Sequence, residues 1–175
     1  MTALNSIINA IGRINELTGK AVSWLTLALV FFVSADVAMR YLFNISFVAL
    51  QELEWHIYSI IFLLGAGYTL KQNGHVRVDL IYQRLGKRHR AYIDVLGCLL
   101  FLFPGCFLVI KTAIPFVYTS YRMHEGSPDP GGLAARYLLK STMIIGFLLL
   151  WIQGAAMLLD RLLYLFGRDG SQGKG

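Results

Sequence analysis

Residues 51–79 read QELEWHIYSIIFLLGAGYTLKQNGHVRVD, and this stretch indicates a membrane-spanning helix with two chemically distinct ends. It opens with two carboxylates and a Trp-His pair, has no charge from Ile57 to Leu70, and ends at Lys71 before an Asn-Gly stop. A helix of about 20 residues is about 30 Å long, the thickness of a bilayer hydrocarbon core. Acid in the first turn and base in the last also suit the helix dipole. We therefore expect a transmembrane helix over residues 51–71.

The composition places the whole chain in a membrane. Of its 175 residues, 56% are hydrophobic and 15% are charged, and the mean hydropathy is +0.57. Soluble domains carry about 25% charged residues. We expect one all-α membrane domain over residues 1–175, with a flexible tail at 167–175. Its long apolar runs predict four transmembrane helices, at residues 21–43, 51–71, 90–121 and 136–166.

The N-terminal segment predicts an amphipathic helix ahead of the first transmembrane helix. Its apolar residues recur at helical spacing, which favours a helix over residues 4–18 lying flat at the membrane surface. A packing face against another protein would show the same pattern. Gly19 and Lys20 are the expected bend into the bilayer. The apolar positions are Leu4, Ile7, Ile8, Ile11, Ile14 and Leu17.

The distribution of basic residues predicts the orientation. Eleven of the 16 lysines and arginines fall in the N-terminal segment, residues 71–90 and the C-terminal end, and five fall on the other side. By the positive-inside rule, both termini are cytoplasmic. The net charge of +6 could suggest nucleic acid, but such binding needs a folded polar surface that this chain lacks. Contact of the basic 71–90 segment with anionic membrane lipids suits it better.

Four charged residues are expected to meet at the outer mouth of the bundle. Asp36 and Arg40 are four residues apart, so they lie on one helix face and can pair. After a short link, Glu52 and Glu54 arrive at the same depth. An acid with its own base one turn away is more often structural than a transport site. We expect a structural charge network of Asp36, Arg40, Glu52 and Glu54.

Other features of the spans predict close packing with neighbours. The strips Gly65-Ala66-Gly67 and Gly154-Ala155-Ala156 permit tight helix–helix contact and are candidate surfaces for a partner. A kink is expected at Pro104-Gly105. Lys111 comes about 20 residues into the third span, so we expect it to reach the outer interface.

Motifs of catalysis, cofactor binding and metal binding are absent from the sequence, so we expect neither an enzyme nor a substrate-binding site. A membrane anchor of a respiratory enzyme is the alternative, but His56, the only histidine in a span, offers no facing pair for haem. A small multidrug exporter would centre an acid in its first helix, whereas Asp36 lies near the outer mouth. The residues favour a scaffold or anchoring subunit that works with partners.

The second span and the segment after it resemble the small membrane subunit of tripartite ATP-independent periplasmic (TRAP) transporters. The resemblance extends to the approach to the fourth span through Gly131, Gly132, Leu133 and Lys140, although no proline follows that lysine here. The matching residues are Glu52, Glu54, Trp55, Gly65, Ala66, Tyr68, Thr69, Leu70, Lys71, Gly74, His75, Val76, Arg77, Val78 and Asp79, and His56 lies among them.

The resemblance implies a function that composition alone could not. In that family a large membrane subunit carries the substrate and sodium sites, and a periplasmic substrate-binding protein delivers an organic acid. The small subunit packs on the large one as a static scaffold in the bacterial inner membrane. This chain would then be a multi-pass membrane protein without cofactor, and none of the substrate-binding residues would lie in it.

Overall fold

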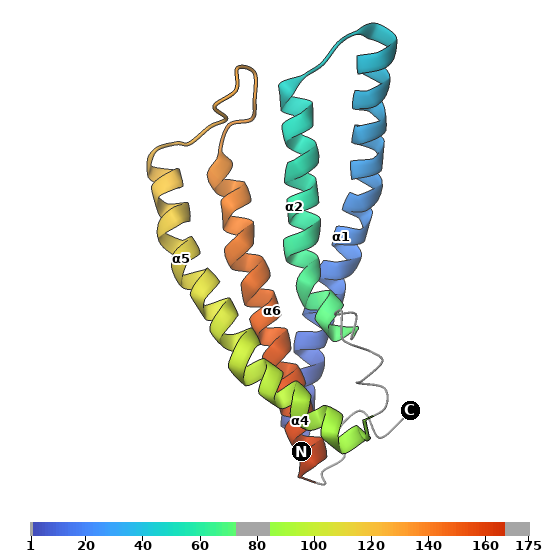
Figure 1. Ribbon diagram of the computed structural model, residues 1–175, viewed down its shortest axis with the longest axis vertical. Helices are drawn as coiled ribbons and strands as arrows, with labels where there is room; N and C mark the ends of the chain where they lie inside the picture. The colour runs from blue at the N-terminus through green and yellow to red at the C-terminus, as the bar shows by residue number, and fades with distance from the viewer. Residues whose placement is uncertain (1, 73–84, 167–175) are drawn as a thin grey trace.

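The computed structural model describes residues 2–72 and 85–166, and this part of the chain is helical with no strand (Figure 1). The expected motif residues Gly74, His75, Arg77 and Asp79, and the expected tail at 167–175, lie outside the described residues. The elements are α1 (Thr2–Phe43), α2 (Val48–Lys71), α4 (Lys87–Gly97), the π-helix η1 (Cys98–Leu102), α5 (Phe103–Arg122) and α6 (Arg136–Leu165).

The helices spread apart toward the outer links, with α2 and α6 in the middle, and converge at the opposite end, where α1 also packs on α6 (Figure 1). Helix α1 packs on α2, α2 packs on α6, and α5 packs on the other side of α6. The start of α1, the end of α2, the start of α4 and the end of α6 share one end of the bundle (Figure 1). The links at residues 44–47 and 123–135 share the other end. We call these the inner and outer ends.

Helix α1 is continuous, so the prediction of a separate helix ending at residue 18 is wrong. Gly19 lies inside α1 and does not end the helix. Its missing side chain makes room for the ring of Tyr68 on α2. A glycine inside a helix costs about 1 kcal/mol, which such packing can offset. The 42-residue helix is about 63 Å long, twice the thickness of the hydrocarbon core. The helix is therefore longer than one crossing of the hydrocarbon core requires.

The third predicted span is a single helical path over residues 87–122 that contains a π-helical turn. This turn, Cys98–Leu102, directly precedes Pro104, which stands in the first turn of α5. Proline cannot donate a backbone hydrogen bond, and a wider turn before it accommodates the gap. The irregularity falls where the kink at Pro104-Gly105 was expected.

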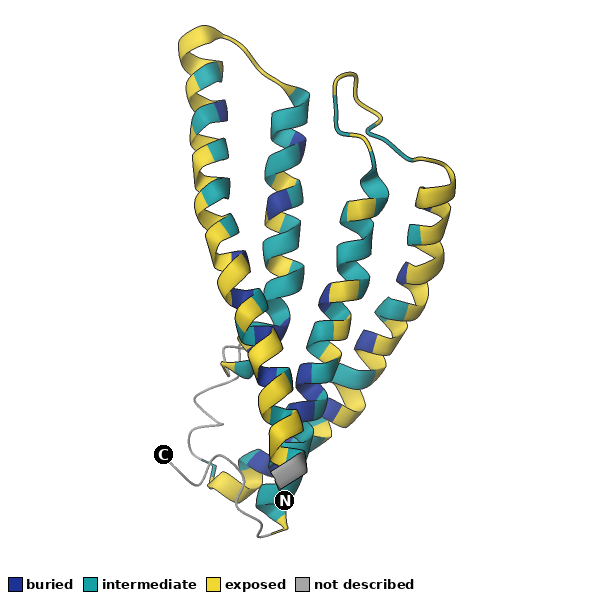
Figure 2. Ribbon diagram, turned by 180° about the vertical axis from the view of Figure 1, so that it is seen from behind, coloured by how far each residue is buried: buried dark blue, intermediate teal, exposed yellow. Residues whose placement is uncertain are grey.

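In the part of the chain that the structure describes, three helical stretches are long and apolar enough to cross a membrane: Leu4–Phe43, Lys87–Arg122 and Arg136–Leu165. The outer sides of α1 and α5 are exposed (Figure 2), and they carry large hydrophobic residues. Trp24 and Phe31 on α1 are 73% and 69% exposed, and Phe107 on α5 is 64% exposed. The buried positions instead include Asn15, Asp36, Glu52, Gln153 and Arg161. This inside-out distribution is that of a protein surrounded by apolar material.

Candidate functional site: polar clusters that join the helices

The outer end holds a cluster around Glu52, which we call the outer clamp and define as Glu52, Ser127, Leu133 and Arg136. The Glu52 carboxylate accepts hydrogen bonds from the Ser127 hydroxyl at 2.5 Å and the Leu133 backbone N–H at 2.6 Å. Arg136 Nη2 lies 3.4 Å from the same carboxylate. The side chain of Glu52 is only 6% exposed. One carboxylate on α2 therefore holds the link between α5 and α6.

Neighbouring residues shape the outer clamp. A Cβ on Gly132 would lie 2.8 Å from Glu52 Oε2, so a glycine is needed for the link to approach α2. The Arg136 guanidinium also lies over the Trp55 ring, 5.6 Å from its centroid. The Trp55 ring contacts that of His56, whose Nδ1 lies 2.5 Å from the Glu52 backbone oxygen. Both motif residues thus pack around the outer clamp.

The expected four-residue charge network is divided into two groups. Arg40 Nη2 pairs with Asp36 Oδ2, and Glu54 lies close enough to this pair to interact with it electrostatically. Glu52 instead belongs to the outer clamp. Residues two apart on a helix point about 200° apart, so two glutamates in the pattern E-x-E face different neighbours. Glu52 therefore does not belong to the predicted network with Asp36 and Arg40.

A second ion pair closes the base of the 123–135 link. The Lys140 ammonium on α6 pairs with the Glu125 carboxylate and lies over the Phe116 ring at 3.9 Å from its centroid. This ammonium holds the pKa of Glu125 below its ordinary value. The Arg136 backbone N–H also donates to the Glu125 carbonyl at 2.9 Å. Side-chain and backbone contacts together fix both ends of the link.

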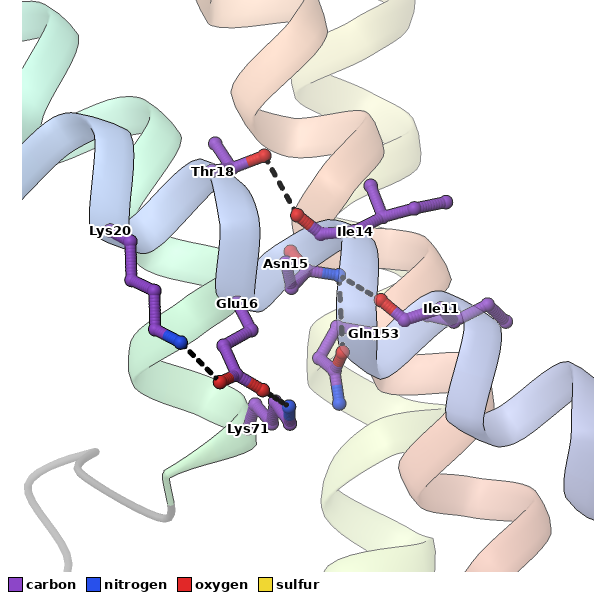
Figure 3. Close-up of polar contacts among 8 residues, drawn as sticks. All are labelled: Ile11, Ile14, Asn15, Glu16, Thr18, Lys20, Lys71 and Gln153. Carbon is purple, nitrogen blue, oxygen red and sulfur yellow. Dashed lines mark hydrogen bonds and ion pairs between the residues drawn. The ribbon is translucent and has the colours of Figure 1, made fainter.

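The inner end has its own polar cluster (Figure 3), which joins α1, α2 and α6. Glu16 pairs with Lys20 at 2.8 Å and with Lys71 at 2.7 Å. Beside it, the Asn15 amide donates to Gln153 Oε1 at 3.1 Å. Asn15 is completely buried. Lys71, taken from the family motif, thus ties the end of α2 to α1.

Asn15 was missed because the expected surface helix put its polar residues against water. A signal was present, since Asn15 falls four residues after Ile11 on the apolar face of residues 4–18. A buried polar group on an apolar helix face needs a polar partner, and Gln153 was the deepest polar group of the last span. A further buried pair, Asp94 with Arg161 at 2.8 Å, joins α4 to α6.

Comparison with known protein families shows to which family the chain belongs. A family model described as "Tripartite ATP-independent periplasmic transporters, DctQ component" matches residues 29–163, well over half of the chain. The chain belongs to the DctQ family. It is therefore a transporter component and not an enzyme, and its apolar helices make it a multi-pass membrane protein. No curated protein matches the chain.

The DctQ match covers the whole outer clamp and both ion pairs of the outer end, whereas Asn15 and Glu16 precede it. The motif residues that carry the resemblance and that the structure describes therefore hold helices together. Trp55 and His56 pack around the clamp, and Lys71 joins α2 to α1. In the described residues, no group of three or more His, Cys, Asp and Glu side chains could hold a metal ion.

The two small-residue strips of this DctQ protein serve mainly its own packing. Gly67 leaves room for the Asn15 amide, and a Cβ on Gly154 would lie 2.5 Å from Leu102. Ala156 is 1% exposed. These three positions are occupied within the chain, which corrects their assignment to a partner surface. Periodicity alone cannot tell an internal helix contact from an external one.

The remaining members of the strips are only half-buried. Gly65 and Ala66 line an open hollow between α1 and α2 with a volume of about 380 Å³. Ala155 on α6 is also half-buried. For these three residues a partner contact stays a prediction.

Proposed function

We propose that this DctQ-family protein is the small scaffold subunit of a secondary transporter in the bacterial inner membrane. The transporter imports an organic acid that a periplasmic substrate-binding protein delivers, and a large membrane subunit carries out the transport with sodium as the coupling ion. Family membership supports the transporter assignment. The partners, the substrate class and the coupling ion are those of the TRAP family that the motifs of residues 52–79 resemble.

One observation favours a scaffold over a transport pathway. The buried polar groups join helices to one another: Glu52 with Arg136, Asn15 with Gln153, and Asp94 with Arg161. Groups used in this way hold a fixed arrangement, because breaking a buried pair leaves an uncompensated charge or dipole. A subunit that alternated between conformations would have to break such contacts in every cycle. The structure supports a rigid body on which a moving partner acts.

We further propose that four helical segments cross the membrane and that the inner end is cytoplasmic. Helix α2 packs along both α1 and α6, with its charged residues confined to the levels of the outer clamp and the inner cluster. Eleven of the 16 basic residues belong to the N-terminal segment, residues 71–90 and the C-terminal end. That asymmetry is typical of a cytoplasmic face.

Single-cysteine labelling in intact cells tests this topology. In a background lacking Cys98 and Cys106, a cysteine at Pro128 reacts with an impermeant reagent from outside, and a cysteine at Arg88 reacts only after permeabilisation. Ready labelling of position 88 from outside would contradict the orientation. Copurification of the tagged chain with the large subunit tests the scaffold role, and its failure in a functional transporter would contradict that role.

A further inference from the structure

Lys111 is an exposed cation on the outer side of α5. The side of α5 that packs on α6 is marked by Cys106, Ala113 and Ser120, which are all buried. Lys111 stands two residues before Ala113, or about 200° around the helix, so it projects away from the bundle. It is exposed and makes no hydrogen bond or ion pair with any described residue. The exposed outer side of α5 is visible in Figure 2.

The depth of Lys111 follows from contacts between α5 and α6. At the outer end, the Tyr121 ring packs against Tyr137 with centroids 5.2 Å apart, one residue after α6 begins. Farther in, the Phe103 ring packs against Trp151 at 6.0 Å. Lys111 lies ten residues before Tyr121, or about 15 Å deeper, which is half the thickness of the hydrocarbon core. At that depth the reach to the outer interface that the sequence predicts is disfavoured.

The direction of α5 also disfavours escape to the outer surface. Every Cα–Cβ bond in a helix tilts toward the helix N-terminus. Helix α5 runs from the inner end to the outer end, so the Lys111 side chain starts out toward the inner end, away from the outer surface (Figure 1). Its neighbours on this side are apolar: Phe107, Leu108 and Ile114 are 64%, 64% and 54% exposed. An unpaired ammonium among lipid chains is costly and marks a functional contact.

Pro115 removes the usual helical donor of a backbone carbonyl at the same place. It lies inside α5, four residues after Lys111, and it has no N–H to donate to the Lys111 carbonyl. Prolines are tolerated in membrane helices where a neighbouring helix or polar group satisfies the freed carbonyl. Lipid chains supply neither a carboxylate nor a donor. Both the ammonium and the carbonyl of one residue therefore need a polar partner at mid-membrane depth.

We infer that the outer face of α5 around Lys111 binds the large membrane subunit, and that Lys111 pairs there with a carboxylate on a membrane helix of that subunit. This inference rests on the proposed scaffold function. The face of α1 differs, because residues 21–35 carry no charged side chain and expose apolar groups such as Trp24 and Phe31. That face suits lipid. Charge complementarity thus distinguishes two otherwise similar apolar faces.

The test uses the full chain coexpressed with its large subunit, with two independent readings. Lys111→Glu, which opposes a carboxylate, reduces the copurified large subunit by at least about tenfold, while Lys111→Arg retains it. A photo-crosslinking residue at Leu108, with Lys111 intact, forms an adduct with the large subunit. The matched position Leu27 on α1, which is 62% exposed, forms none.

The outcomes separate this inference from the function on which it rests. If the wild-type chain copurifies with the large subunit, but Lys111→Glu copurifies equally and Leu108 forms adducts only with phospholipid, the inference is overturned and the scaffold function stands. If the wild-type chain does not copurify with the large subunit in a functional transporter, both are overturned. Helix content and thermal unfolding of Lys111→Glu show whether a loss of binding reflects misfolding. The Leu108 crosslink decides the matter in that case, because it leaves Lys111 unchanged.

Discussion

Replacing Glu52 with glutamine should release the 123–135 link while keeping the size of the side chain. The carboxylate now accepts from Ser127 and Leu133 and pairs with Arg136, and its side chain is only 6% exposed. Hydrogen bonds to charged groups contribute about 1.5–3 kcal/mol each, and the two bonds reach different carboxylate oxygens, of which a glutamine keeps only one. Its NH₂ group then faces a donor. We expect a loss of about 2–4 kcal/mol in local stability.

Hydrogen exchange, measured by mass spectrometry on the protein in detergent, reports the loss of local stability in the 123–135 link. The amide of Leu133 should exchange at least about tenfold faster in Glu52→Gln, since each 1.4 kcal/mol is a factor of ten. Glu54→Gln is the matched control, because it makes the same chemical change two residues away without touching the link. Unchanged exchange in Glu52→Gln, or equal acceleration in both variants, would refute the role assigned to Glu52.

Three further expectations follow from other contacts. A double-mutant cycle of Asn15→Leu and Gln153→Leu should give a coupling energy of about 1 kcal/mol in thermal unfolding, and additivity would show that the hydrogen bond contributes nothing. Gly67→Ala should lower the free energy of unfolding by about 1–3 kcal/mol, because its methyl group overlaps the Asn15 amide; an unchanged midpoint would contradict that contact. Because its pairing with Lys140 lowers the pKa of Glu125, the pair stabilises the link above the ordinary carboxylate pKa of about 4.3. This stabilisation is lost as the pH falls below that value, and Lys140→Met should reduce the pH dependence of proteolysis in the link.

The helices were largely predictable from the sequence, because apolar runs of membrane length are a strong signal. The path at residues 4–43 was not, since whether Gly19 ends a helix depends on Tyr68, which lies 49 positions away in the chain. A local pattern contains no information on such a partner. The same holds for Gly67 and Gly154, whose small size serves contacts inside the chain.

The charged residues at the outer end were also predictable only in part. The spacing of Asp36 and Arg40 predicts their pair, because both lie on one helix face. The partners of Glu52 come from residues 75 to 84 positions later, on a link whose path no periodicity predicts. Helical geometry does predict that Glu52 and Glu54 face apart, and it excludes a single shared network.

Transport by purified components in proteoliposomes tests the central claim most directly. Vesicles receive an inward sodium gradient, a labelled organic acid and its binding protein, together with this chain alone, the large subunit alone, or both. A scaffold subunit predicts concentrative uptake only when both membrane chains are present. Sodium-driven uptake by this chain alone would contradict the account.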